Sequence, residues 1–220
     1  MKHKYLSLAV LSLFSGMTMA ATSVTLYGTA EIAYRDQTGD NLSLRQDAAG
    51  ESRLGVKGQE DLGNGTAAFF QLESRYDLDT GANTGTAAGT GFFDEKAVVG
   101  LSFANGAHKV YFGKSASPID RLGNNIGHLA NDFGVKTSMG GWRNGAFYDY
   151  NANGLAVAAA VTTKGGAYSP NTANVTEGGK DTKSSYGISA RYDAANWYFG
   201  AGWQADNDKS HAVDSSGLYT

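Results

Sequence analysis

Residues 52–65 read SRLGVKGQEDLGNG, and this stretch decides between a β-strand with its turn and a glycine-rich phosphate-binding loop. Leu54 and Val56 alternate with Arg53 and Lys57, as in a β-strand that sends successive side chains to opposite faces. The glycines that follow lack the Gly-Lys-Ser/Thr ending of a phosphate-binding loop, and no helical pattern comes after them. The stretch therefore predicts a strand with one apolar and one charged face, ending in a tight turn.

The same alternation recurs along the chain and predicts nine strands. They occupy residues 24–35, 52–59, 66–77, 93–103, 108–114, 143–150, 155–163, 184–192 and 196–205. Short connections at 60–65, 104–107, 151–154 and 193–196 alternate with long polar ones at 36–50, 77–92, 115–142 and 164–183. Three of the four short connections contain Asn-Gly, which suits the positive φ angles of hairpin turns. Consecutive strands are therefore expected to pair antiparallel.

A strict alternation of short and long connections is typical of an outer-membrane barrel, with tight periplasmic turns and long external loops. A soluble β-sandwich has no reason to follow this rule. Aromatic residues lie near both ends of the strands, as expected at two membrane interfaces, among them Tyr34, Phe103, Tyr150, Tyr192 and Trp197. We therefore predict an all-β fold, a transmembrane antiparallel up-and-down β-barrel.

The first 20 residues have the three parts of a secretory signal peptide: a basic start, a short apolar run and small residues near Ala20. The apolar run is too short to cross a bilayer as a helix. We expect residues 1–20 to be removed on export and residues 21–220 to form the barrel portion. The chain has no cysteine, which excludes disulfides and thiolate metal sites, and its formal net charge of −3 gives no reason to expect a nucleic-acid partner.

Four segments carry a family resemblance. They are SVTLYGTAEIAY (23–34), SRLGVKGQEDLGNGTAAFFQLES (52–74), FFDEKAVVGLSF followed by VYFGKS (92–115), and WRNGAFYDYNANGL (142–155). In these segments the sequence resembles the general porins of Gram-negative bacteria, of the neisserial and beta-proteobacterial type. The resemblance implies a sixteen-stranded barrel in the outer membrane, a homotrimer when full length, and a third loop, here residues 115–142, that folds into the lumen and narrows it.

Two features depart from the family pattern. Lys114 stands where the family usually carries arginine, which keeps the charge but loses the planar, bidentate guanidinium. Nine strands also leave the chain end on the external side, in a polar stretch that begins near Asp206, and we therefore expect an amino-terminal part of a longer porin. The alternative is a complete small barrel of eight or ten strands.

The expected function is passive diffusion of ions and small hydrophilic solutes, with selectivity set by size and by charged side chains in the lumen. The pore-lining candidates are Arg53, Lys57, Glu73, Arg75, Lys114, Asp120, Asp132, Arg143 and Arg191. Arg53, Arg75, Lys114 and Arg143 are expected to face Asp120 and Asp132 of the third loop across the narrowest section. The same charges could instead only hold the loop against the wall.

Two other functions fit the sequence less well. A barrel hydrolase needs a nucleophile beside a base, yet the histidines after the signal peptide, His108, His128 and His211, lie in separate segments without a motif. The sequence also lacks a His-Glu-x-x-His zinc motif, so we expect no enzyme activity, no cofactor and no metal. An adhesin or structural anchor with binding loops stays open as the other alternative.

Overall fold

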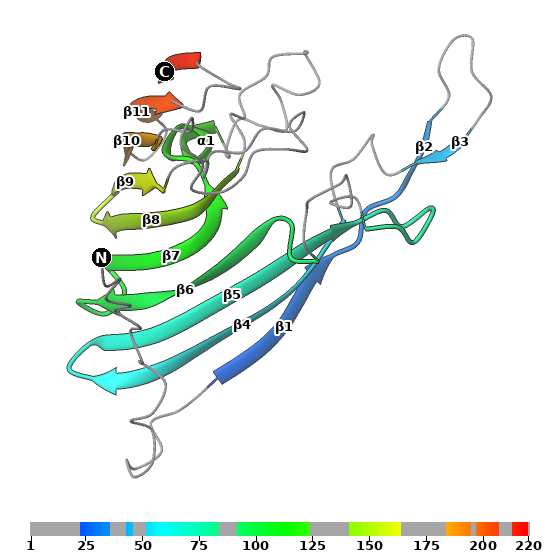
Figure 1. Ribbon diagram of the computed structural model, residues 1–220, viewed down its shortest axis with the longest axis horizontal. Helices are drawn as coiled ribbons and strands as arrows, with labels where there is room; N and C mark the ends of the chain where they lie inside the picture. The colour runs from blue at the N-terminus through cyan, green and yellow to red at the C-terminus, as the bar shows by residue number, and fades with distance from the viewer. Residues whose placement is uncertain are drawn as a thin grey trace, which may run out of the picture.

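The computed structural model describes residues 23–35, 43–45, 52–83, 92–123, 141–163, 184–194, 197–206 and 213–219. These residues form an all-β structure with one short helix (Figure 1). The main sheet has ten strands. In spatial order they are β1 (Ser23–Thr29), β4 (Ser52–Gly63), β5 (Thr66–Tyr76), β6 (Lys96–Phe103), β7 (His108–Ala116), β8 (Gly141–Ala152), β9 (Leu155–Thr162), β10 (Tyr186–Ala194), β11 (Trp197–Asp206) and β12 (Val213–Tyr219).

Each main-sheet strand pairs with the next one along the chain, and every pairing is antiparallel. Among the described residues the sheet is open, with β1 and β12 at its two edges. This arrangement confirms the predicted all-β antiparallel up-and-down class. A second sheet of two strands pairs β2 (Ala33–Arg35) with β3 (Ser43–Arg45).

The Asn-Gly turns have the backbone conformation that their sequence indicates. Asn64 and Gly65 have φ angles of 53° and 71°, and Asn153 and Gly154 have φ angles of 53° and 78°. Asparagine and glycine adopt positive φ more readily than other residues, so these dipeptides close hairpins tightly. The turn between β10 and β11 lies at residues 195–196, outside the described residues.

The structure adds elements to those predicted. All nine predicted strands are present, and β12 adds a tenth in a stretch predicted to be an exposed loop. Its sequence, VDSSGLY, lacks a clear alternation of apolar and polar residues, which explains why the pattern did not reveal it. The first predicted strand is divided into β1 and β2, and β3 lies within the predicted connection 36–50.

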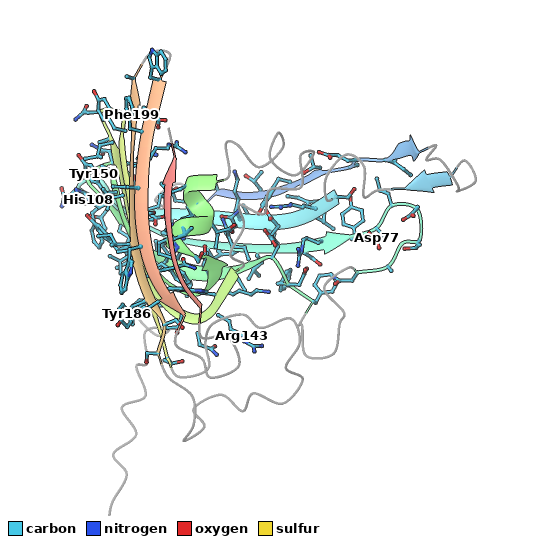
Figure 2. The ribbon with its side chains drawn as sticks, turned by 90° about the horizontal axis from the view of Figure 1, so that it is seen from above. Asp77, His108, Arg143, Tyr150, Tyr186 and Phe199 are labelled. Atoms are coloured by element: carbon cyan, nitrogen blue, oxygen red, sulfur yellow. The ribbon has the colours of Figure 1, made fainter. Side chains whose placement is uncertain are left out.

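One face of the main sheet carries large apolar side chains that no part of the described structure covers. Leu26 is 73% exposed and Phe199 is 57% exposed, and Val99, Phe112 and Ile188 share this outward face. In Figure 2 the labelled side chains of Tyr150 and Phe199 lie on this face, opposite α1 (Pro118–Gly123). A continuous exposed apolar face of this kind is expected where a protein wall contacts lipid.

Aromatic side chains mark both ends of the outward face. Tyr192 and Trp197 lie beside the connection between β10 and β11, and both are exposed. At the opposite ends of the same two strands, the rings of Tyr186 and Trp203 lie 5.5 Å apart. The sequence predicted the placement of Tyr192 and Trp197, and Tyr186 with Trp203 adds the opposite end. Both suit amphipathic rings at two membrane interfaces.

The inward face is less uniformly polar than the alternation suggests. A buried apolar cluster on this face contains Val98, Tyr111, Trp142, Phe147 and Ala160. Phe69 packs against the cluster from β5. The inner wall thus includes a dry patch, centred on β6 to β9, in addition to its charged residues.

The exposed apolar face allows a direct test with the substitution Val99→Arg near the middle of β6. We expect this change to lower the free energy of unfolding in phospholipid vesicles by about 2–4 kcal/mol, because a charge on the lipid face must leave water. The matched control is Gln59→Arg, at an exposed position of β4 with the opposite, inward facing. Equal losses in urea titrations of the two variants would contradict the assignment of the faces.

Candidate functional site: the charged inner wall and the helix packed against it

A cluster of five charged residues covers the inner face of β4 and β5 and the segment before β6. We call it the charged wall cluster, and its members are Arg53, Glu73, Arg75, Asp94 and Glu95. The register places Arg53 directly opposite Arg75. Like charges at directly opposite positions repel each other, so this pair requires carboxylates nearby.

Three carboxylates supply that compensation. Arg53 lies 3.2 Å from Glu73 and 3.2 Å from Glu95, and Arg75 lies 2.7 Å from Asp94 and 3.3 Å from Glu95. The Asp94 carboxylate is buried, and it also accepts a hydrogen bond of 2.8 Å from the backbone N–H of Arg75. A buried carboxylate needs such donors, because desolvation without them is costly. Asp94 therefore fixes the segment before β6 against the end of β5.

Lys114 reaches this cluster from β7 through a break in the strand geometry. Simple alternation places Lys114 on the outward face with Val110 and Phe112. However, Gly113 has a φ angle of 125°, and the β7–β8 register shifts between Gly113 and Ser115. The Lys114 ammonium donates a hydrogen bond to the backbone carbonyl of Asp94. The irregularity thus turns Lys114 toward the Asp94–Arg75 ion pair, as bulges commonly re-aim side chains.

Tyr27 of β1 extends the cluster across β4. Its hydroxyl donates a hydrogen bond of 2.7 Å to Glu73 and accepts one of 2.6 Å from the side-chain amide of Gln71. The Lys57 ammonium lies 5.3 Å from the centre of the same ring. Gly55 leaves the space for this ring, because a Cβ atom there would lie only 2.4 Å from it.

The helix α1 packs against the inner face of β10 and β11. Pro118 begins the helix, and Ser117 precedes it as an N-cap whose hydroxyl accepts a 3.2 Å hydrogen bond from the Asp120 N–H. The buried side chains of Ile119 and Leu122 lie over Gly202, where an added Cβ would be 2.6 Å from the Ile119 Cδ1 atom. Only a glycine therefore permits so close an approach between helix and wall.

Two polar contacts complete this packing. The Ser189 hydroxyl donates a hydrogen bond of 2.7 Å to the carbonyl of Pro118. The side-chain oxygen of Gln204 accepts one of 3.3 Å from the Ile119 N–H. The Ile119 N–H is one of the first donors of the helix, which have no partner within it, so Gln204 satisfies this group. The Ser189 contact adds a second polar link between helix and wall.

Arg121 ties α1 to β7 and β8. Its guanidinium donates hydrogen bonds to the Asp149 carboxylate and the Tyr111 hydroxyl, and further ones of 3.1 Å to Ser115 Oγ and 3.2 Å to the Ala116 carbonyl. It also lies 5.5 Å from the ring centre of Tyr111 and 5.7 Å from that of Phe147. A cation–π contact combined with several directed donors is a role that arginine fills better than lysine.

A cavity of about 450 Å³ lies between α1 and the strand ends at the short turns. Arg121 and Leu122 line it from the helix, and Lys109, Asp149 and Arg191 line it from the wall. Arg191 is paired at 3.0 Å with Asp193. Small side chains at Ala156 and Ala158 leave the space open.

The predicted site residues can now be placed. Arg53, Lys57, Glu73, Arg75 and Arg191 belong to the inner face. Lys114 contacts the charged wall cluster, Asp120 lies in α1, and Arg143 lies half-buried in β8 and is labelled in Figure 2. Asp132 lies outside the described residues.

The two arginines have carboxylate partners on the wall itself. The structure pairs Arg53 and Arg75 with Glu73, Asp94 and Glu95. That the same arginines face Asp120 and Asp132 across the lumen stays a prediction. Sequence reasoning missed Glu95 and Asp149 as partners of wall and loop arginines. Alternation within 143–150 indicates that Asp149 faces inward. Nothing in the sequence indicates that Glu95 contacts arginines on both β4 and β5.

Histidine and carboxylate side chains do not gather as metal ligands do. Among the described residues, no group of His, Asp and Glu side chains could hold a metal ion. Nowhere in the described ranges is a helix long and apolar enough to cross a membrane. His108 forms a 2.9 Å hydrogen bond with the Tyr148 hydroxyl, on the outward face shown in Figure 2.

A curved antiparallel sheet with an exposed apolar face, a charged inner face and a helix packed on the inside defines the wall of an outer-membrane barrel protein. The family model described as "Gram-negative porin" matches residues 7–219. The chain therefore belongs to the Gram-negative porin family, whose members lie in the outer membrane.

Several relatives are named as outer-membrane proteins. Outer membrane porin protein 32 of Delftia acidovorans is 43% identical over 90 residues, which are 39% of this chain and 25% of that protein. An outer membrane porin protein of Bordetella pertussis is 27% identical over 237 residues, 89% of this chain and 60% of that protein. The major outer membrane protein P.IB of Neisseria gonorrhoeae is 33% identical over 129 residues, 54% of this chain and 34% of that protein.

A solved structure shares the fold. The anion-selective porin from Comamonas acidovorans aligns with a TM-score of 0.58 and 23% identity, covering 90% of this chain and 62% of that one. The chain thus spans at most about three fifths of the length of these relatives. At this identity the likeness establishes the fold alone.

The Arg121 contacts predict a measurable coupling between α1 and β8. A double-mutant cycle with Arg121→Gln and Asp149→Asn should give a coupling energy of about 1–3 kcal/mol in the free energy of unfolding, because the pair is partly buried and charge-assisted. The control cycle uses Arg191→Gln and Asp193→Asn, a pair on one strand with a more exposed carboxylate. Its coupling should stay below about 1 kcal/mol. Independent effects of Arg121→Gln and Asp149→Asn would show that the pair does not tie the helix to the wall.

Proposed function

We propose that the protein is an outer-membrane diffusion pore that lets ions and small hydrophilic solutes pass without energy input. The single observation that carries this proposal is the two-sided wall. Its outward face exposes large apolar side chains such as Leu26, and its inward face holds the charged wall cluster with a packed helix beside it. Such a wall separates hydrocarbon from water.

The packed helix supports a constriction. In this proposal the connection between β7 and β8 narrows the lumen, and α1 is its first part. The predicted bounds of 115–142 are too wide, because residues 115–116 and 141–142 pair with each other as the ends of β7 and β8. Ile119, Leu122 and Arg121 hold α1 on the side of β7 to β11. The passage for solutes then lies between the helix and the charged wall cluster of β4 to β6. Charged groups on that wall would meet each ion as it passes.

The remaining parts of the proposal follow from family membership. Members of the family are channels, and we propose that this chain has no enzymatic activity of its own. We further propose a homotrimer in the full-length protein, and removal of residues 1–20 during export. The porin names of the relatives from Delftia and Bordetella support the channel role. The basic start and short apolar run of residues 1–20 support their removal.

Conductance of the purified full-length protein tests the function. Added to a planar lipid bilayer in KCl, it should produce stepwise increases in current, because each inserted pore adds a water-filled path. Heat-denatured protein is the control. Membrane insertion without any current would contradict the pore and favour an anchoring role.

The charged wall cluster predicts the direction of a selectivity change. Replacing both Arg53 and Arg75 with glutamine should shift the reversal potential under a KCl gradient toward cation preference, since the cluster's three carboxylates stay on the wall. Glu73 and Asp94 remain hydrogen-bonded by other groups, namely Tyr27 and the Arg75 backbone. An unchanged reversal potential would remove these arginines from the ion path.

A further inference from the structure

Glu95 has a fixed place within the charged wall cluster. It lies directly before β6, and its backbone N–H donates a hydrogen bond of 3.1 Å to the carbonyl of Glu73 on β5. Its neighbour Asp94 is buried and bonded to Arg75 on both backbone and side chain. The backbone at Glu95 is therefore held by its own bond to Glu73 and by the bonds of Asp94 to Arg75.

The two carboxylate oxygens of Glu95 contact arginines from two adjacent strands. Oε1 lies 3.2 Å from the Arg53 Nη1 atom, and Oε2 lies 3.3 Å from the Arg75 Nε atom. These arginines stand directly opposite each other in the β4–β5 register. One carboxylate thus lies between two positive charges that would otherwise repel.

The three acids of the cluster differ in their contact with water. The side chains of Asp94 and Glu73 are 0% and 9% exposed, whereas that of Glu95 is 29% exposed. Arg53, at 39%, is the most exposed arginine of the cluster. A field acts on a passing ion most strongly from charges at the water boundary, because buried pairs largely cancel within the wall.

We infer that Glu95 is a selectivity-determining residue of the pore. By bridging Arg53 and Arg75 at the water boundary, it weakens the attraction of this wall for anions and so lowers the chloride-to-potassium permeability ratio. The inference rests on the proposed function. It assigns a role to a residue that the charge pattern of the sequence does not single out. Its removal leaves both arginines facing the lumen with less compensation.

The test uses Glu95→Gln in the full-length protein, with reversal potentials measured under a KCl gradient at about 0.1 M or lower, where screening is weak. Glutamine keeps the shape and an acceptor oxygen for the guanidiniums, so the main change is the charge. The chloride-to-potassium permeability ratio should rise about twofold, as expected for removing one charge about 10 Å from the ion path in water. Glu95→Asp should keep the wild-type ratio.

The matched control is Glu60→Gln, which removes the same charge from the outward parity of β4 near a short turn. It should leave the permeability ratio unchanged. Any of three outcomes for Glu95→Gln would overturn the inference: a permeability ratio equal to that of wild type, a shift of the ratio toward potassium, or a change in single-channel conductance without a change in the ratio. Those outcomes leave the pore itself intact, whereas absence of wild-type current would contradict the proposed function instead.

Discussion

Hydrogen bonding of the backbone in a medium without water is the constraint on which this structure depends. Inside a bilayer every N–H and C=O group must find a partner within the protein, and each unsatisfied group costs several kcal/mol. Between β1 and β12 the main sheet meets this demand by pairing each strand with the next, and within the described residues only the outer edges of these two strands lack a neighbouring strand. Because pairing fixes the strand orientation, alternate side chains must meet two different surroundings. The apolar outward face and the charged inward face follow from that geometry.

The inner wall divides into two parts with different physical roles. Between β1 and β6, side chains pair through charge, with Arg53 and Arg75 at the centre. Between β6 and β9, the rings of Tyr111 and Phe147 stack 5.2 Å apart and form a dry support beneath Arg121. Glycine at position 202 then admits α1 close to the wall. The helix is held against β10 and β11 by packing and against β7 and β8 by Arg121.

The sequence predicted the strands, the tight turns and the two faces, because each depends on local chemistry. Alternation of Leu54 and Val56 with Arg53 and Lys57 is visible without a structure, and Asn-Gly identifies a turn directly. Pairings between segments are not local. Glu95 contacts Arg53 across two strand boundaries, so no spacing rule could reveal it. The predicted opposition of Arg53 to Asp120 and Asp132 stays a prediction for the same reason, since it needs the path of a loop rather than the facing of a strand.

The break in geometry at Gly113 and Asn144 has a wider consequence. If side chains alternated regularly back from Phe147, Trp142 would face outward, yet its side chain is buried in the inner apolar cluster. The alternation is broken near Asn144, which has a φ angle of 54°. The alternation of side chains therefore resets at the irregularity between β7 and β8, next to the connection that holds α1. In the proposed pore, this single irregular step of the main chain directs the connection that holds α1 to the inner face of the wall.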